Sequence, residues 1–469
     1  MNAEEILKRG REITKSPIRK PNIGKLNDAY AALKSSTPKS FLLSEKAKEV
    51  LPNGSQHTLP LSDPYPFFMK KGMGSILVDV DGNSFIDYIL SGGAIILGHN
   101  DEGLVSTIHE LLTQKTHFHG HFDALEIAAA EKIISFFPSI EKVRFTSSGS
   151  EANAAAVKIA RSVTGKKKLI KFMGNYHGWG NEFLVDVEVP GSGKFISQGI
   201  PDEFMDQTVL VPQNNPEALE AAFKTLENKG GVAAVICEPM GAESGLIPFE
   251  EGFHEQAIEI AHRYGALYIF DEVVTGFRMG IGGAQKWLGI TPDLTTLGKG
   301  MMNGFPSCGA VGGKKEIMDA ASTGLPMKQP YTFIGGTLAG NTLSMAACHY
   351  VVSSLLDYNL LEKAASTADD VTRKLNDLFD SGDTGFFAYN FGNILRVEMT
   401  APHAVEITSQ EAMHEVVMRR KILSAYSVMI SSAGVLSRMG RDFVSCAHST
   451  ADNDRYVAAY KKLIDALDG

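Results

Sequence analysis

Cysteine is scarce in this chain, and long apolar runs are missing. The 469 residues include four cysteines, none in Cys-x-x-Cys spacing: Cys237, Cys308, Cys348 and Cys446. Scattered cysteines predict reduced thiols rather than a disulfide framework. No apolar stretch approaches the roughly 20 residues that span a bilayer, and the N-terminal stretch lacks the apolar core of a signal peptide. We therefore predict no membrane span and a cytoplasmic location.

Positive charge is not in excess either. Lysine and arginine number 45 against 54 aspartate and glutamate residues, which leaves a formal net charge of −9 at pH 7. Nucleic-acid binding needs clustered Lys and Arg for phosphate contacts, so nucleic acid is not expected as a partner. The 44% hydrophobic fraction is ordinary for a globular protein, and the 46 glycines suit an α/β chain with many tight turns.

The periodicity of the sequence divides it into four parts. Residues 1–40 are polar and mixed in charge, and we expect a solvated, partly helical arm. Residues 41–100 form an N-terminal segment that joins a smaller domain, and apolar runs around Asp81-Gly82 predict a β-hairpin there. Residues 101–340 alternate apolar runs with amphipathic helical stretches, which predicts a mostly parallel sheet flanked by helices. Residues 341–469 are expected to form a smaller α/β domain that ends in a helix.

Polar side chains follow the apolar runs that we expect to be parallel strands. Because ligands bind outside the carboxyl ends of the strands in open α/β sheets, these side chains are expected to converge at one edge. They are the loop Ser147–Ser150 after "VRFT", Tyr176-His177 after "KLIKF", Glu238 after "VAAVIC", Asp271 after "ALYIF" and Lys299 after "LTTLG". The Ser/Gly loop is either a phosphate cradle at a helix start or a simple N-cap with a capping-box acid.

Lys299 is a single cation in an apolar run flanked by glycines. It is not a P-loop lysine, because Gly300 follows it and Asp293 occupies the upstream glycine position of that motif. A desolvated lysine can act as nucleophile and proton carrier. Asp271, unless it is a helix N-cap, needs a cation or a donor if it is buried. A phosphate cradle, a buried acid, an aromatic ring and a reactive lysine together describe a site for pyridoxal 5′-phosphate (PLP).

The spaced motifs resemble those of class III, fold-type I PLP enzymes, and within them the glutamate-1-semialdehyde aminomutase-like group. The matching motifs are "DVDGNSFIDY", "FTSSGSEAN", "YHG", "DEVVTGFR", "PDLTTLGKG", "GGTLAGN" and "DFVSCAHSTAD". The resemblance covers nearly the whole chain beyond about residue 40. It implies a fold-type I architecture: a large PLP-binding α/β domain with a mostly parallel central sheet, plus a smaller α/β domain built from N- and C-terminal segments.

The resemblance also implies a role for each matching residue. Lys299 would form the Schiff base with PLP, and Asp271 would pair with the pyridinium nitrogen. The other implied cofactor contacts are Val273 and Tyr176 on the two ring faces, Ser148, Gly149 and Ser150 around the phosphate, Glu238 beside the ring hydroxyl, His177 next to the stacking aromatic, and Thr337 at the phosphate of a neighbouring subunit. The contact from Thr337 implies a homodimer with shared active sites.

The chain departs from the group's pattern on the substrate side. The group carries an arginine near the N-terminus that holds the substrate carboxylate, whereas residues 51–66 contain none. His57 is a candidate in this stretch, but it lacks the two parallel hydrogen bonds that an arginine offers. An acid of the group is replaced here by Gly440. We therefore expect a substrate carboxylate at Arg396, Arg438 or Arg441, unless these arginines form surface ion pairs.

A histidine-rich stretch, "HFHGHF", covers residues 117–122. On a strand, His117, His119 and His121 would share a face and could bind a metal. No cysteine or acid accompanies them at close spacing, so we expect no metal site. The resemblance places the stretch near the mouth of the active site, where substrate contact or loop packing is expected.

Three functions are compatible with these residues. The first is a PLP-dependent aminotransferase that moves an amino group from an α- or β-amino acid to a keto acid or aldehyde through Lys299. The second is a glutamate-1-semialdehyde 2,1-aminomutase, in which the amino group returns to the same molecule; the missing arginine counts against it. The third, a non-catalytic PLP-fold protein, ranks last because Lys299 and Asp271 are both present.

Overall fold

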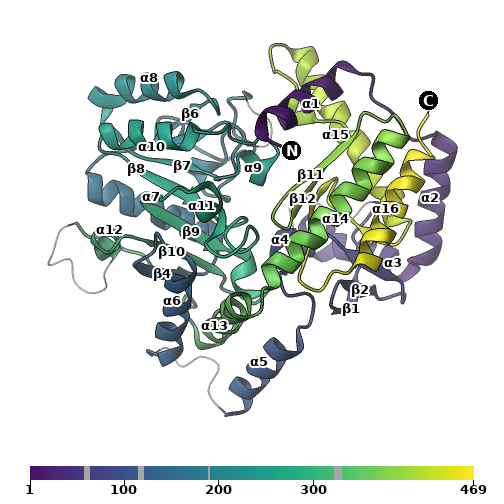
Figure 1. Ribbon diagram of the computed structural model, residues 1–469, viewed down its shortest axis with the longest axis horizontal. Helices are drawn as coiled ribbons and strands as arrows, with labels where there is room; N and C mark the ends of the chain where they lie inside the picture. Colours follow the sequence, from purple (N-terminus) through teal and green to yellow (C-terminus); the bar gives the residue numbers. More distant parts are fainter. Residues whose placement is uncertain (57–63, 115–120, 188–190, 322–329, 469) are drawn as a thin grey trace. The chain divides into compact units, whose positions relative to one another are not determined.

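The computed structural model describes residues 1–56, 64–114, 121–187, 191–321 and 330–468. The chain forms two compact units, which are labelled by element in Figure 1. The first comprises Met1–Leu7 and Gly103–Leu361, and the second comprises Lys8–Glu102 and Glu362–Gly469. The sequence-based division assigned residues 341–361 to the C-terminal part, whereas helix α13 (Thr342–Asp357) belongs to the first unit. None of the described helices is long and apolar enough to cross a membrane.

The first unit is built around a seven-stranded sheet in the order β4-β10-β9-β8-β7-β5-β6. Its strands are β4 (Lys142–Thr146), β5 (Lys168–Phe172), β6 (Thr208–Val211), β7 (Val232–Cys237), β8 (Leu267–Asp271), β9 (Leu294–Gly298) and β10 (Gly309–Gly313). Strands β6, β5, β7, β8 and β9 pair in parallel, and β10 runs antiparallel to both β9 and β4. Six strands therefore point the same way, which confirms the predicted mostly parallel sheet.

Helices cover both faces of this sheet. The helices of this unit are α5 (Glu102–Gln114), α6 (Ala124–Phe136), α7 (Gly149–Thr164), α8 (Pro216–Leu226), α9 (Ala242–Gly245), α10 (Phe253–Arg263), α11 (Gly283–Leu288), α12 (Lys315–Met318) and α13, and those that cover the faces of the sheet include α7, α8 and α10. Because successive side chains of a strand point to opposite faces, Ile170 and Phe172 of β5 pack with α8 and α10, whereas Leu169 packs with α7. Side chains on both faces of the sheet are thus buried, and Figure 1 shows helices on either side of it.

The second unit contains two smaller sheets around its own core. Its helices are α1 (Ala3–Lys15) and α14 (Leu360–Ser381), which both span the division between the units, and α2 (Ile23–Ser36), α3 (Pro38–Val50), α4 (Leu90–Gly93), α15 (Gln410–Ser431) and α16 (Thr450–Ile464). One sheet has the order β1-β2-β3-β13, with bounds Met69–Met73, Ile76–Asp79, Ser84–Asp87 and Val435–Leu436. The other has the order β11-β12-β14, with bounds Phe387–Phe391, Ile394–Glu398 and Arg441–Phe443.

Two sequence predictions concern elements of this unit. The hairpin predicted around Asp81-Gly82 is confirmed, since β2 and β3 pair antiparallel on either side of it. The solvated N-terminal arm is wrong for α2, because Ala29 and Leu33 are buried in the core of the second unit. Their i, i+4 spacing places both on one face of the helix, and that face was missed in a mostly polar stretch.

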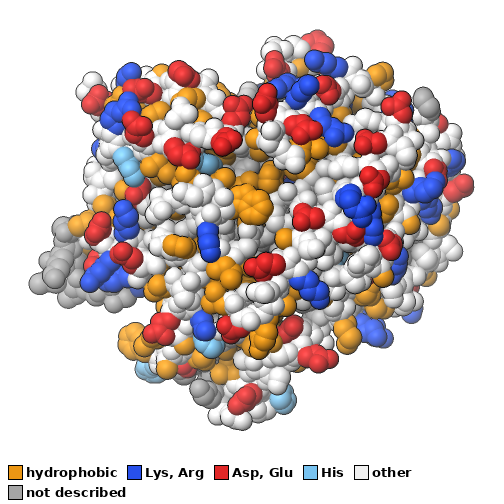
Figure 2. All heavy atoms as spheres, in the orientation of Figure 1, with side chains coloured by type: hydrophobic (Ala, Val, Ile, Leu, Met, Phe, Trp, Pro, Cys, Tyr) orange, Lys and Arg blue, Asp and Glu red, His pale blue; other side chains and the backbone are white. Residues whose placement is uncertain are grey.

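The surface carries charges of both signs. On the face shown in Figure 2, Lys and Arg side chains are interspersed with Asp and Glu side chains, without a broad field of one sign.

Candidate active site

Five of the predicted positions meet at the carboxyl edge of the first unit's sheet. Ser148 caps helix α7 directly after β4, and Tyr176 follows β5. Glu238 comes after β7, Asp271 ends β8, and Lys299 follows β9. Since β5, β7, β8 and β9 are parallel neighbours, their carboxyl ends lie at the same edge. The structure therefore brings these side chains to one region of one unit.

The carboxylate of Asp271 is the centre of a buried hydrogen-bond network. Its Oδ2 accepts from Asn153 Nδ2 (2.7 Å) and lies 2.7 Å from His177 Nδ1. Its Oδ1 accepts from the backbone N–H of Val273 (3.1 Å) and the hydroxyl of Thr296 (3.5 Å). Asp271 is only 4% exposed, and its donors are an amide, an imidazole, a hydroxyl and a backbone N–H. The charge is oriented, and no Lys or Arg among the described residues pairs with it.

Asn153 holds this network to helix α7. Its Nδ2 also donates to the carbonyl of His177 (3.0 Å), and its Oδ1 accepts from the hydroxyl of Thr296 (2.6 Å). One side chain thus ties the start of α7, the loop after β5 and strand β9 together. Every polar atom of the Asn153 side chain is used, as a buried amide requires.

His177 is fully buried and faces Asp271 through Nδ1. Burial lowers the pKa of His177 from 6.5, the neighbouring Asp271 opposes this shift, and Lys171 adds to it. Its Nε2 has no hydrogen-bond partner within the described part of the chain. A histidine in this setting orients and supports the carboxylate.

The start of helix α7 is a cradle with close backbone approach. The side chain of Ser148 accepts from the backbone N–H of Glu151 (3.2 Å), and the N–H groups of Gly149 and Ser150 have no partner within the described residues. A Cβ atom on Gly149 would lie 2.8 Å from Val273, so only glycine lets the helix start approach that side chain. Free N–H groups at a helix N-terminus favour an anion such as phosphate.

Lys299 lies beside this cradle. Its backbone is left-handed, with φ of 43°, a conformation that a non-glycine residue seldom adopts. The preceding Gly298 packs so closely that a Cβ there would lie 3.2 Å from Val273 and 3.6 Å from the Cα of Gly149. The lysine thus leaves its strand through a strained backbone step, next to the helix start.

Glu238 is buried, and its carboxylate accepts four hydrogen bonds from two loops. Oε1 accepts from the N–H groups of Tyr176 (2.9 Å) and Glu243 (2.7 Å), and Oε2 accepts from the N–H (2.6 Å) and hydroxyl (3.1 Å) of Ser244. Glu243 and Ser244 are both left-handed, with φ of 44° and 55°. Burial raises the pKa of Glu238 to about 8, against the effect of the Tyr176 N–H. The acid thus holds the Tyr176 loop to the turn after β7.

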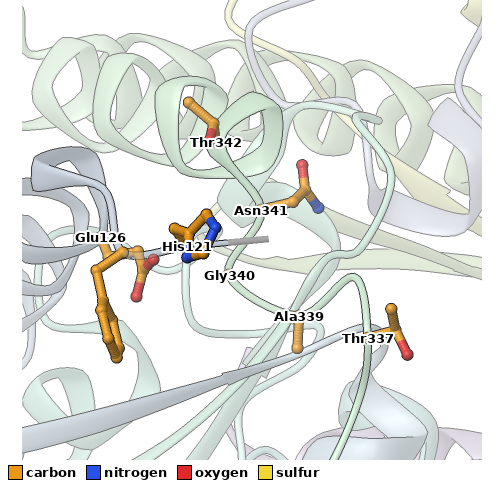
Figure 3. Close-up of a pocket in the computed structure, with 8 residues that line it drawn as sticks. His121, Glu126, Thr337, Ala339, Gly340, Asn341 and Thr342 are labelled. Carbon is orange, nitrogen blue, oxygen red and sulfur yellow. The ribbon is translucent and has the colours of Figure 1, made fainter. Parts of the chain in front are cut away.

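Tyr176 and Thr337 are the exposed members of the predicted set. Tyr176 is 43% exposed, so part of its surface is accessible to a ligand. Thr337 lines a pocket of about 230 Å³, which Figure 3 shows. The other lining residues are His121, Phe122, Glu126, Ala339, Gly340, Asn341 and Thr342. His117 and His119 lie outside the described residues, and no group of metal-binding side chains occurs among those that are described.

The candidate substrate arginines all lie in the second unit. Arg396 is 2% exposed, and its Nη1 donates to the carbonyls of Leu395 (2.8 Å) and Asp442 (3.3 Å). Arg438 and Arg441 are half-buried at the turn before β14 and at its start. His57 lies outside the described residues. Arg396 is therefore partly engaged by backbone, whereas the two later arginines are more accessible.

Three contributors to the site were not identified from the sequence: Asn153, Thr296 and Ser244. Asn153 had a visible signal, because asparagine is unfavourable inside a helix unless its side chain has a special partner. Thr296 and Ser244 had none, since a threonine in a strand and a serine in a turn are ordinary.

The family model for "Aminotransferase class-III" matches residues 60–445. The chain belongs to the class-III aminotransferase family. A curated relative of this chain, the glutamate-1-semialdehyde 2,1-aminomutase of Methylacidiphilum infernorum (isolate V4), is 39% identical over 440 residues, which cover 89% of this chain and 96% of that protein. The resemblance drawn from the motifs is thereby confirmed.

Solved structures share the fold of this chain. An omega-transaminase from Sphaerobacter thermophilus is 27% identical, with a TM-score of 0.82 over 91% of this chain and 97% of that one. A transaminase with PLP bound is 26% identical, with a TM-score of 0.80 over 92% and 97% of the two chains. The fold-type I architecture predicted from the sequence is confirmed.

Proposed function

We propose that this class-III aminotransferase is a PLP-dependent enzyme that moves an amino group with the help of Lys299, and that its first candidate reaction is that of a glutamate-1-semialdehyde 2,1-aminomutase. The network around Asp271 carries the cofactor part of the proposal. The aminomutase named among the relatives, at 39% identity over most of both chains, supports the reaction. This reverses the order of our sequence-based hypotheses, in which transfer between two molecules came first.

The described residues fit PLP at three points. The N–H groups of Gly149 and Ser150 suit its phosphate. The carboxylate of Asp271 is buried with neutral donors only, so it suits a pyridinium N–H. Val273 packs against Gly149 and Gly298, which places an apolar wall between the phosphate cradle and the lysine. When bound, PLP withdraws electrons from the substrate carbon and carries the amino group.

The chain's own groups would then do four things. Lys299 Nζ would hold the cofactor and move a proton to and from the substrate carbon. Asp271 would keep the ring nitrogen protonated, with Asn153 and His177 orienting it. Tyr176 would cover the ring face opposite Val273. Glu238, whose acceptor positions are occupied by loop donors, would position Tyr176 rather than contact the cofactor.

Intermolecular amino transfer remains the second candidate for two reasons. Residues 51–66 contain no arginine for the substrate carboxylate. Transaminases are also among the similar solved structures, at 26–27% identity. In this reaction an amino acid would donate its amino group, and a keto acid or aldehyde would accept it. Arg438 or Arg441 would then hold the carboxylate.

The dimer is part of the proposal. Thr337 is exposed and lines an open pocket, which suits a contact to the phosphate in a second copy of the chain. The homodimer and the cytoplasmic location stay predictions.

One preparation separates the two reactions. Protein loaded with PLP is given glutamate-1-semialdehyde with no acceptor, and separately amino donors with keto acids. Isomerisation without an acceptor supports the aminomutase. Transfer that requires both partners, with no isomerisation, overturns it in favour of the transaminase. The same tests on Lys299→Ala, with the exposed Lys314→Ala as control, are expected to show loss of either activity by about 10³-fold or more in the first variant alone.

A further inference from the structure

Strand β5 carries a lysine that the proposed reaction does not use. Lys171 is 0% exposed, and its neighbours across the sheet are Leu210 and Ile236. A fully buried lysine is rare because its charge must leave water. Its presence in the run "KLIKF" therefore calls for a function.

Lys171 faces the same side of the sheet as Asp271. Leu169 and Ile269 both pack against α7, and side chains two residues apart on a strand share a face. Lys171 therefore follows Leu169 on that face, and Asp271 follows Ile269. The buried cation and the buried carboxylate lie on the α7 side of the sheet, on strands separated by β7 alone.

The loop after β5 contacts both Lys171 and His177. Lys171 Nζ donates to the carbonyl of Val185 (2.8 Å). Two residues earlier, the ring of Phe183 packs edge-on against the ring of His177, with centroids 6.0 Å apart. The loop closes on itself where the N–H of Gly174 donates to the carbonyl of Asp186 (2.9 Å). Lys171 thus supports the segment that packs beside His177.

The contacts of His177 favour one protonation state. Nδ1 lies 2.7 Å from a carboxylate oxygen of Asp271, and an ionised carboxylate only accepts, so Nδ1 carries the proton. Nε2 is buried without a partner in the described part of the chain. A proton on Nε2 would create a buried, unpaired N–H on a buried cation, which is costly. A bare Nε2 lone pair is the less costly state.

We propose that Lys171 is a positioning residue for the proposed reaction: it keeps His177 neutral with its proton on Nδ1, so that Asp271 retains a full negative charge. This inference rests on the proposed function, because the retained charge is what a pyridinium N–H needs. If His177 became an imidazolium, the Asp271–His177 pair would be neutral, and the ring nitrogen would lose its counter-charge.

The surrounding charges are consistent with this role. His177 is influenced by Asp271, which raises its pKa, and by Lys171, which lowers it. Lys171 in turn is influenced by Asp186 and Glu238, and burial lowers its pKa to about 7. A histidine becomes charged only below about pH 6.5. Lys171 is itself a cation in that range, so it opposes the protonation of His177 where protonation would otherwise occur.

The test measures His177 without cofactor or substrate. Apo-protein labelled with ¹⁵N-histidine is titrated by NMR, and His177 is assigned from the signal missing in His177→Gln. We expect wild-type His177 to titrate below the ordinary histidine pKa of about 6.5, and to carry its proton on Nδ1 while it is neutral. In Lys171→Met the titration midpoint should rise by about one pH unit or more. Lys167→Met, an exposed lysine of the same segment, should leave the midpoint unchanged.

Two outcomes would overturn the inference. One is a wild-type His177 that carries its proton on Nε2 or titrates at pH 6.5 or above, which needs no variant and so survives a Lys171→Met protein that does not fold. The other is an unchanged midpoint in folded Lys171→Met. Lys171→Arg, which keeps a cation, should behave like the wild type. Failure of the proposed function would appear separately, as absent turnover with the titration of His177 intact.

Discussion

Asn153 on α7 and Asp271 on β8 are joined by a 2.7 Å hydrogen bond between buried side chains. The bond links helix α7, whose start is the proposed phosphate cradle, to the strand that carries the acid. It also leaves the Asp271 carboxylate in one orientation, because Oδ2 is held from two sides.

Replacing Asn153 with alanine should therefore affect both folding and catalysis. The change removes donors from Asp271 and His177 and an acceptor from Thr296. We expect a loss of about 1–3 kcal/mol in the free energy of unfolding and a weaker affinity for PLP, measured by denaturant titration and by cofactor binding. Asn228→Ala, an exposed asparagine, is the control. Equal behaviour of the two variants would show that the network is not needed.

The Gly309→Ala variant tests the close packing behind the cradle. A Cβ at this position would lie 2.2 Å from the carbonyl oxygen of Ser148 and 2.4 Å from Thr146 Oγ1. The start of α7 must shift, at a cost of about 1–3 kcal/mol, and affinity for the cofactor phosphate should fall. Gly10→Ala adds the same methyl inside helix α1, where the nearest atom lies 3.6 Å away, and it should lower neither quantity. A Gly309→Ala protein with unaltered cofactor affinity would contradict the proposed cradle.

The buried position of His254 predicts that the free energy of unfolding depends on pH. Its side chain lies between the carbonyl of Pro239 (2.8 Å) and the hydroxyl of Tyr268 (3.1 Å), and burial lowers its pKa from 6.5 to about 4. A lowered folded-state pKa means that the stability is fully present above pH 6.5 and is lost as the pH falls through 4. Relative to His254→Gln, the wild type should lose up to about 3 kcal/mol over that window.

Unfolding free energies measured by denaturant between pH 7 and pH 4 check this slope. His109→Gln, which removes an exposed histidine, should keep the slope of the wild type. Parallel curves for the wild type and His254→Gln would contradict the assignment.

Substitutions of the arginines of the second unit should differ in whether they change the unfolding temperature or KM. Arg396 is buried with backbone partners, so Arg396→Gln should lower the unfolding temperature. Arg438 is half-buried, and its guanidinium has no hydrogen bond within the described residues. If it binds a substrate carboxylate, Arg438→Gln should raise KM about 10-fold or more with little change in unfolding temperature. A KM unchanged in Arg438→Gln and raised in Arg441→Gln would move the role to Arg441.

Much of the first unit was predictable because buried parallel strands appear in the sequence as continuous apolar runs. Runs such as "VAAVIC" and "ALYIF" are apolar throughout, since both faces of the sheet are covered. The polar residue after each run then marks the carboxyl edge. This logic located Glu238, Asp271 and Lys299 at one edge, although it could not supply their hydrogen-bond partners.

The rest depended on tertiary packing that a local pattern does not contain. Helix α2 looked solvated, because its buried face consists of small or isolated apolar residues such as Ala29 and Leu33. The hydrogen bonds that Glu238 accepts from the left-handed turn at Glu243-Ser244 could be seen only in three dimensions. Backbone conformations of this kind are decided by the loop as a whole.

The left-handed backbone of Lys299 implies that the lysine lowers the stability of the fold at the position where the proposed reaction needs its amine. A non-glycine residue at φ of 43° costs about 1–2 kcal/mol relative to one that accepts this conformation freely. Lys299→Gly and Lys299→Ala both delete the amine, yet only glycine relieves the backbone. The glycine variant should thus unfold at a higher temperature than the alanine variant. The proposed catalytic lysine is retained at a position where backbone conformation alone would favour glycine.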